Sequence, residues 1–297
     1  MTGTAIPNPG VLFPWTMGPL LAALSAVVYG CADYCGGSAT RRLPAATVTV
    51  MSQLAGLLTV LILLPIVPGT PSMTDIALGA VGGLAGGTGI MLLYRSLALG
   101  AMSVVSPVTA VCAALVPAGI GLAAGERPGA VALTGIGLAI AAIVLVSVVP
   151  APAASDRPTL PIRRVLAGAL GAGTGFGLFF VLLAWTGDDA GLWPLLGARP
   201  VSIALAATVA RRMAAPLRIP RRDWPVVAAA GVLDMGANAL YLLATAGEQL
   251  AVVAVLASLY PASTVALARL LGAERLRPIQ WSGLMCAGGA LVLLALR

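Results

Sequence analysis

The sequence contains no histidine and no lysine, and charged residues make up only 9% of its 297 positions. Soluble domains carry roughly 25% charged residues, so this chain has too few to cover a surface that faces water. It lacks the side chain most often used for metal binding and for acid–base catalysis near neutral pH. The four cysteines, Cys31, Cys35, Cys112 and Cys286, form no C-x-x-C pair, and we interpret them as packing residues. We therefore expect neither a metal nor another cofactor.

Apolar sequence is abundant instead. Hydrophobic residues make up 59% of the chain, and the mean hydropathy is +1.01. A membrane-spanning helix needs about 20 apolar residues, and such stretches occur near 17–38, 44–66, 76–98, 103–124, 129–149, 164–186, 192–210, 225–246, 250–272 and 279–296. The sequence predicts an all-α polytopic membrane protein with about ten transmembrane helices, preceded by a disordered tail at 1–16.

The chain divides into two similar halves. A hydrophilic linker at 150–163 separates residues 17–149 from residues 164–297, with five predicted spans in each half. "LAAGERPGAVALTGIGLAI" in the first half matches "LLGAERLRPIQWSGLMCAG" in the second, and "YRSLALGAMSVVSP" matches "YLLATAGEQLAVVAV". Because five is odd, the halves must cross the membrane in opposite directions. Such inverted repeats are common in secondary transporters, which place their binding site between the repeats.

The chain resembles the EamA-type branch of the drug/metabolite transporter superfamily. The resemblance covers all ten spans and is most specific in "SLYPASTVALARLLGAERLRPIQWSGLMCAGGALVLL" (258–294) and in "YGCADYCGGSATRRLPAATVTVMSQLAG" near the N-terminus. It implies two inverted five-helix units and a permease or exporter of small metabolites, amino acids or drugs. It also implies a central cavity lined by spans 1, 3, 4, 6, 8 and 9, and a location in the bacterial cytoplasmic membrane.

Arginines predict the orientation in the membrane. The connections after spans 1, 5, 7 and 9 hold twelve arginines, whereas the opposite side has only Arg127 and Arg297. Basic connections tend to remain cytoplasmic, which places both termini outside, although many members of the superfamily are drawn with both termini inside. The arginine-rich stretch 211–222 needs no nucleic acid to explain it, so we expect small-molecule substrate and membrane lipid as partners; a second copy of the chain is a further candidate.

Two carboxylates lie deep inside predicted spans. Asp33 in span 1 and Asp234 in span 8 are eight and ten residues from the predicted cytoplasmic side, hence at similar depths. Tyr29 lies one turn before Asp33, and Asn238 lies one turn after Asp234, with Tyr241 three residues further on. Because ionisable groups inside spans usually serve function, we expect both aspartates to face the cavity and to couple transport to protons or bind a cationic group. The alternatives are static pairs, of Asp33 with Arg95 or of Asp234 with a neighbouring span.

Further candidate site residues are Arg199, Tyr260 and Pro261. Arg199 lies inside span 7, where the repeat places Gln53 of span 2 opposite it; it could hold a substrate carboxylate or serve structure. A proline frees a backbone carbonyl one turn earlier, so we expect Pro107 and Pro117 to break span 4 and Pro261 to break span 9. Gly82/Gly86 and Gly171/Gly175 predict close packing of spans 3 and 6.

These features favour a secondary active transporter that works by alternating access. A polytopic membrane enzyme acting on lipid-linked substrates is the alternative, but the chain lacks histidine and a long catalytic loop. An ion channel would need a ring of like groups or a filter loop, and neither is evident. We therefore expect a protein that is not an enzyme.

Overall fold

The computed structural model describes residues 17–40, 42–99, 102–147, 162–246, 248–272 and 277–296, which form helices and connections without any strand. The predicted tail at 1–16 and nearly all of the predicted linker lie outside these residues. The helices are α2 (Met17–Thr40), α3 (Ala45–Leu63), α4 (Met73–Leu99), α5 (Met102–Ala123), α6 (Ala130–Ser147), α7 (Ile162–Ala184), α8 (Trp193–Arg212), α9 (Trp224–Thr245), α10 (Leu250–Ala257), α11 (Tyr260–Gly272) and α12 (Pro278–Ala295).

Ten predicted spans correspond to these helices one by one, except that the ninth comprises both α10 and α11. Nine segments of the described chain are long and apolar enough to cross a membrane, and α5 contributes a shorter apolar stretch (Val108–Ala123). Helices are the expected form, because a spanning segment in lipid must satisfy its own backbone hydrogen bonds. The prediction of an all-α polytopic membrane fold is confirmed.

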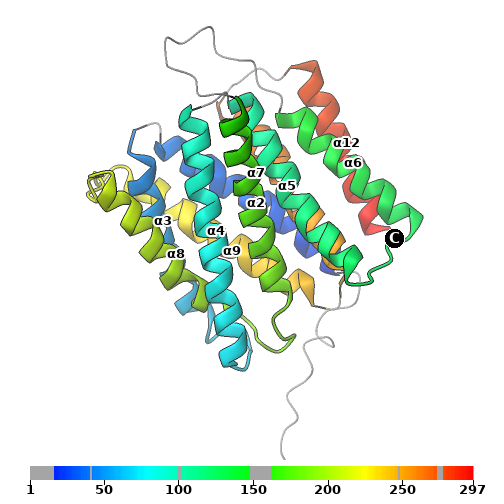
Figure 1. The fold of residues 1–297 in the computed structure, drawn as a ribbon, viewed down its shortest axis with the longest axis horizontal. Helices are drawn as coiled ribbons and strands as arrows, with labels where there is room; N and C mark the ends of the chain where they lie inside the picture. Colours follow the sequence, from blue (N-terminus) through cyan, green and yellow to red (C-terminus); the bar gives the residue numbers. More distant parts are fainter. Residues whose placement is uncertain are drawn as a thin grey trace, which may run out of the picture.

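The helices pack as one bundle in which α2 lies along α9 and α4 lies along α7 (Figure 1). The helix pair α3 and α8 forms one edge of the bundle, and the pair α6 and α12 forms the opposite edge. The pairs α2–α9 and α4–α7 lie at the centre of the bundle. Helix α5 packs against α7, and in the equivalent way α10 and α11 pack against α2. The cavity described below lies between the central helices and the α3–α8 edge.

Glycines allow some of these backbones to approach closely. A Cβ on Gly175 of α7 would meet the Ala85 carbonyl oxygen of α4 at 2.7 Å, so this glycine is needed for the α4–α7 contact. Gly83 of α4 similarly faces the backbone of Ala198 in α8. Gly86 differs, because a Cβ there would meet only the Phe179 side chain, at 3.4–3.5 Å. The two helices therefore pack closely, as predicted, but Gly86 and Gly175 do not have equivalent roles.

The sequence predicts that prolines break both span 4 and span 9, but only span 9 is broken. Span 9 is broken between α10 and α11, at Ser258 and Leu259, just before Pro261. Span 4 is not broken, because α5 continues through Pro107 and Pro117. At the break, the Leu259 N–H donates to Leu256 and the Ala262 N–H donates to Leu259, so tight turns replace part of the helical hydrogen-bond ladder. A single helix adapts to a proline when its neighbours accommodate the loss of that hydrogen bond.

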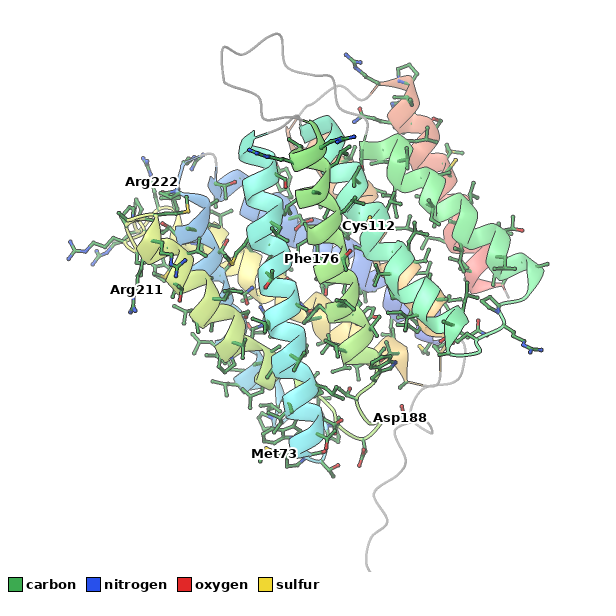
Figure 2. All side chains as sticks on the ribbon, in the orientation of Figure 1. Met73, Cys112, Phe176, Asp188, Arg211 and Arg222 are labelled. Carbon is green, nitrogen blue, oxygen red and sulfur yellow. The ribbon has the colours of Figure 1, made fainter. Side chains whose placement is uncertain are left out.

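Polar contacts join the connections at each end of the bundle. At one end Arg42 forms an ion pair with Asp223 at 3.3 Å, and Thr47 donates to the Pro216 carbonyl. At the other end Glu126 accepts hydrogen bonds from the Leu250 and Ala251 N–H groups, at 2.6 and 3.0 Å. Figure 2 shows Arg211 and Arg222 beside the α8–α9 connection, well away from Asp188 in the α7–α8 connection. Each end is thus held by contacts between the two halves of the chain.

Candidate functional site

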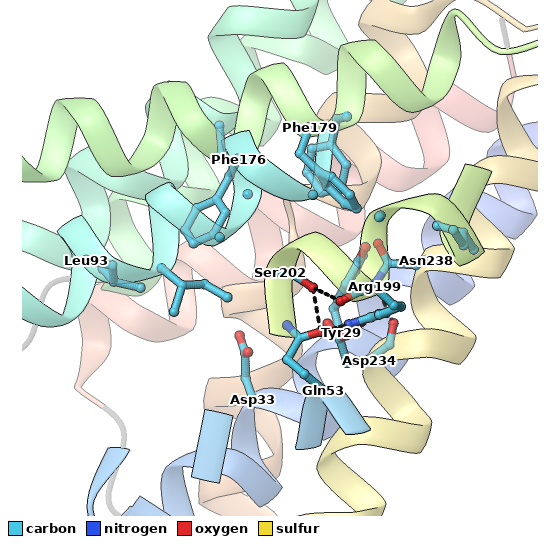
Figure 3. Close-up of a pocket in the computed structure, with 18 of the residues that line it drawn as sticks. Tyr29, Asp33, Gln53, Leu93, Phe176, Phe179, Arg199, Ser202, Asp234 and Asn238 are labelled. Carbon is cyan, nitrogen blue, oxygen red and sulfur yellow. Dashed lines mark hydrogen bonds and ion pairs between the residues drawn. The ribbon is translucent and has the colours of Figure 1, made fainter. Parts of the chain in front are cut away.

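A cavity of about 240 Å³ lies within the helix bundle (Figure 3). Its wall is mostly apolar, with a few polar groups, as in small-molecule binding sites. Most of the helices contribute to it: α2, α3, α4, α5, α7, α8, α9 and α11. The lining residues are Tyr29, Asp33, Gln53, Gly83, Gly86, Gly87, Ile90, Leu93, Ala113, Phe176, Phe179, Phe180, Leu195, Ala198, Arg199, Ser202, Asp234, Asn238 and Tyr260.

Arg199 and Asp234 form an ion pair on one side of the cavity. The guanidinium Nη2 lies 2.7 Å from the Asp234 carboxylate, and Nη1 donates to the Gln53 amide oxygen. The Arg199 side chain is only 7% exposed, whereas that of Asp234 is 38% exposed. Two partners therefore occupy the buried guanidinium, and the carboxylate retains a face toward the cavity. A buried charge needs such partners, which explains the cluster.

Asp33 has a different environment. It lies on α2, is exposed to the cavity and has no hydrogen-bond or ion-pair partner among the described side chains. Figure 3 shows it across the cavity from Phe176, apart from the cluster around Arg199. The same face of α2 becomes more accessible along the helix, from buried Ser25 through Tyr29 to exposed Asp33 and Gly37. No described side chain therefore competes with a ligand or a proton for this carboxylate.

The structure brings six of the eight predicted site residues to the cavity wall and leaves two behind it. Tyr29, Asp33, Arg199, Asp234, Asn238 and Tyr260 line the cavity. Tyr241 is fully buried; its hydroxyl donates to the Phe180 carbonyl oxygen at 3.1 Å, and its ring lies 4.5 Å from that of Phe180. Pro261 is buried beside the break in span 9. These two residues support the wall.

Two helices that the sequence did not place in the wall contribute to it. The resemblance implied a cavity lined by spans 1, 3, 4, 6, 8 and 9, but Gln53 of α3 and Arg199 of α8 also line it. Ser202, one turn after Arg199, lies 3.3 Å from the Gln53 amide oxygen. An amide in the middle of an apolar span was the available signal for Gln53. For α7, the signal was the spacing of Phe176, Phe179 and Phe180, which places three rings on one helix face.

The sequence left open whether Asp33 and Asp234 form static pairs, and the structure answers this for Asp234 only. Asp234 is paired with a neighbouring span, through Arg199. The proposed pair of Asp33 with Arg95 lies outside the described side chains. Within the described residues, no group of three or more Cys, Asp or Glu side chains could hold a metal ion.

Comparison with known proteins points to one family. Residues 163–296 match the model of the EamA-like transporter family. No curated protein matches the sequence significantly. A crystal structure with 16% sequence identity superposes with a TM-score of 0.75 and covers 93% of this chain and 95% of its own. At that identity the likeness concerns the fold alone.

Proposed function

We propose that this chain is an EamA-like transporter, and that it carries small metabolites, amino acids or drugs across a bacterial cytoplasmic membrane by alternating access; the match of residues 163–296 to that family model supports this. The observation that carries this proposal is the cavity, which sits inside a helix bundle and holds a carboxylate without a described partner, Asp33. Ionisable groups at this depth are costly unless function retains them.

The helix contacts support an origin in two inverted repeats, 17–149 and 164–297. If the two halves are exchanged, α2 takes the place of α7 and α9 takes the place of α4, so the α2–α9 contact becomes the α7–α4 contact. The α3–α8 and α6–α12 pairs each join equivalent helices and therefore remain the same. The contact between Arg199 and Gln53 has the same property, because the sequence repeat aligns these two residues. Residues that are equivalent and also touch lie near the axis that relates the repeats. A site on such an axis can be exposed to either side by rocking of the repeats.

The two ends of the bundle differ in a way that supports access from one side. All of α10 is buried, and Glu126 joins the α5–α6 connection to its first residues. At the opposite end of α2, the face that carries Asp33 is exposed at Gly37, where a Cβ would meet no other atom within 4 Å. We infer that this conformation is the state of an alternating-access cycle that is closed at the α10 end.

We further propose that Asp33 couples transport to protons. It can gain and lose a proton in contact with the cavity, and the other charged groups of the described wall, Asp234 and Arg199, neutralise each other. Tyr29 and Tyr260 are the other titratable groups that line the cavity beside it. A carboxylate without a fixed counter-ion changes the charge of the cavity when it is protonated, so an imposed proton gradient would bias its occupancy.

Counterflow in proteoliposomes tests the transport proposal. Vesicles loaded with unlabelled candidate solutes should accumulate labelled solute transiently when the solute is a substrate, and an imposed pH gradient should increase or reverse the flux. Empty vesicles and vesicles with heat-denatured protein are the controls. Absence of counterflow for every small metabolite, amino acid and drug tested, with well-folded protein, would contradict the proposal.

The orientation is a separate proposal that rests on the arginine distribution. The connection 211–222 should be cytoplasmic and both termini external. A C-terminal alkaline phosphatase fusion should then be active and a fluorescent-protein fusion dark. The opposite pattern would reverse the orientation and leave the fold unchanged.

A further inference from the structure

Aromatic rings are concentrated around the cavity. The whole chain has four phenylalanines, five tyrosines and five tryptophans. No tryptophan is among the described lining residues, but five of the nine phenylalanine and tyrosine side chains line the cavity: Tyr29, Phe176, Phe179, Phe180 and Tyr260. They come from α2, α7 and α11. Walls rich in apolar and aromatic side chains are typical of small-molecule sites. The concentration indicates a ligand that contacts rings.

Four of these five rings form a connected group next to Asp33. The centroid of Tyr29 lies 6.2 Å from that of Phe180 and 6.2 Å from that of Tyr260, and Phe179 lies 5.9 Å from Phe180. Tyr29 is one helical turn before Asp33 on the same face of α2. An aromatic surface beside a carboxylate favours positive charge, because ring faces attract cations.

The charges of the wall point in the same direction. Arg199 is the one basic residue among the described lining residues, and Asp234 and Gln53 already occupy its guanidinium. A ligand carboxylate would have to displace one of those partners from a side chain that is only 7% exposed. Asp33 requires no such displacement. With the Arg199–Asp234 pair neutral, ionised Asp33 leaves the described wall with one net negative charge.

We propose that the cavity binds organic cations with a single positive charge and an aromatic or other apolar body. The cationic group lies against Asp33, and the body lies against the rings of α7 and against Tyr29 and Tyr260. This assignment rests on the proposed function only in using the same cavity, because it concerns binding and does not require transport. A cation and a proton cannot both neutralise Asp33, so a bound cation would displace the proton.

Calorimetry on purified protein in detergent tests the assignment. The probe is benzyltrimethylammonium, which keeps its charge at every pH, and the comparison compounds are benzyl alcohol, phenylacetate and L-phenylalanine. We expect benzyltrimethylammonium to bind at least about tenfold more tightly than each of the others, which corresponds to about 1.4 kcal/mol. Equal or tighter binding of phenylacetate or L-phenylalanine would overturn the proposal.

Two variants localise the site. Asp33→Asn should weaken binding of benzyltrimethylammonium by about tenfold or more, and Phe179→Leu, which keeps apolar volume but removes a ring, should weaken it by about three- to thirtyfold. Asp188→Asn makes the same charge change at an exposed position outside the cavity, and binding should be unchanged. Unaltered binding in folded Asp33→Asn protein would overturn the proposal.

The outcomes also separate this inference from the transport proposal. Binding of benzyltrimethylammonium that depends on Asp33, without any flux in proteoliposomes, would support the cation site and contradict transport. Flux of an anion or a neutral solute, without binding of the cation, would support transport and overturn the cation site.

Discussion

Asp33 and Asp234 line the same cavity but have different surroundings. Asp234 lies 2.7 Å from a buried guanidinium, and Asp33 has no described partner. Both are carboxylates on cavity-lining helices, each with polar neighbours one turn away. What separates them is α8, which brings Arg199 to one and not to the other. A carboxylate inside a membrane span can therefore serve structure or ligand binding, according to the helix that packs beside it.

The largest effect is expected when the paired carboxylate is changed. Asp234→Asn leaves Arg199 buried with Gln53 as its remaining described polar side-chain partner, and breaking a buried pair costs about 3–5 kcal/mol. We expect a value near the lower limit, because Asp234 is 38% exposed. The yield of monodisperse protein and its thermal midpoint should both fall. The double variant Arg199→Gln with Asp234→Asn removes both charges and should recover much of the loss; normal yield of the single variant would show that the pair is dispensable.

The second prediction concerns the unpaired carboxylate. Asp33→Asn should fold with normal yield, because it breaks no contact to a described side chain, yet gradient-driven transport should fall at least about tenfold, as for loss of an essential proton-transfer group. Exchange without a gradient should survive better. Asp33→Glu keeps the carboxylate and serves as the matched control. Full uphill transport by Asp33→Asn in proteoliposomes would contradict a coupling role for Asp33.

A third prediction extends the comparison from charges to glycines. A Cβ on Gly175 would approach the Ala85 carbonyl at 2.7 Å, whereas one on Gly86 would meet only the Phe179 side chain at 3.4–3.5 Å. Gly175→Ala should therefore lower stability by about 1–3 kcal/mol, as overpacking does, and Gly86→Ala should lower it less. Thermal unfolding in detergent measures both. Equal midpoints for the two variants would contradict the packing assigned to Gly175.

The smallest effect is expected at the surface. Arg42 pairs with Asp223, but its side chain is 66% exposed, and Arg222 also contacts Asp223, at 3.4 Å. The Asp223 side chain is only 2% exposed, but it would keep Arg222 as a partner, so loss of the exposed Arg42 should cost about 0–1 kcal/mol, as for exposed ion pairs. Arg42→Gln should thus shift the thermal midpoint little, and transport should remain. If Arg42→Gln lowered the thermal midpoint as much as Asp234→Asn does, the contact between the α2–α3 and α8–α9 connections would be a main source of the bundle's stability.

Much of this arrangement could be predicted from the sequence, because it depends on local periodicity. Apolar run lengths gave the spans, and helical spacing placed Tyr29 and Asn238 beside the two aspartates. A pair of Asp234 with a neighbouring span remained an alternative, but Arg199 could not be named as the partner, since that depends on where α8 lies and how far Arg199 extends toward α9. The proline in span 9 coincided with a break and those in span 4 did not, because neighbouring helices decide whether a lost hydrogen bond opens the chain.

The hydrogen bonds of Glu126 to the first residues of α10 bear on the speed of the transport cycle. If the bundle opens at that end, both bonds, at 2.6 and 3.0 Å, must break before the α5–α6 connection can leave α10. Bonds to a charged group are worth roughly 1.5–3 kcal/mol each, and every 1.36 kcal/mol of barrier slows a step about tenfold. The turnover number would then be set by separation of the α5–α6 connection from the start of α10. Substrate affinity would be set at a different place, at Asp33 in the cavity.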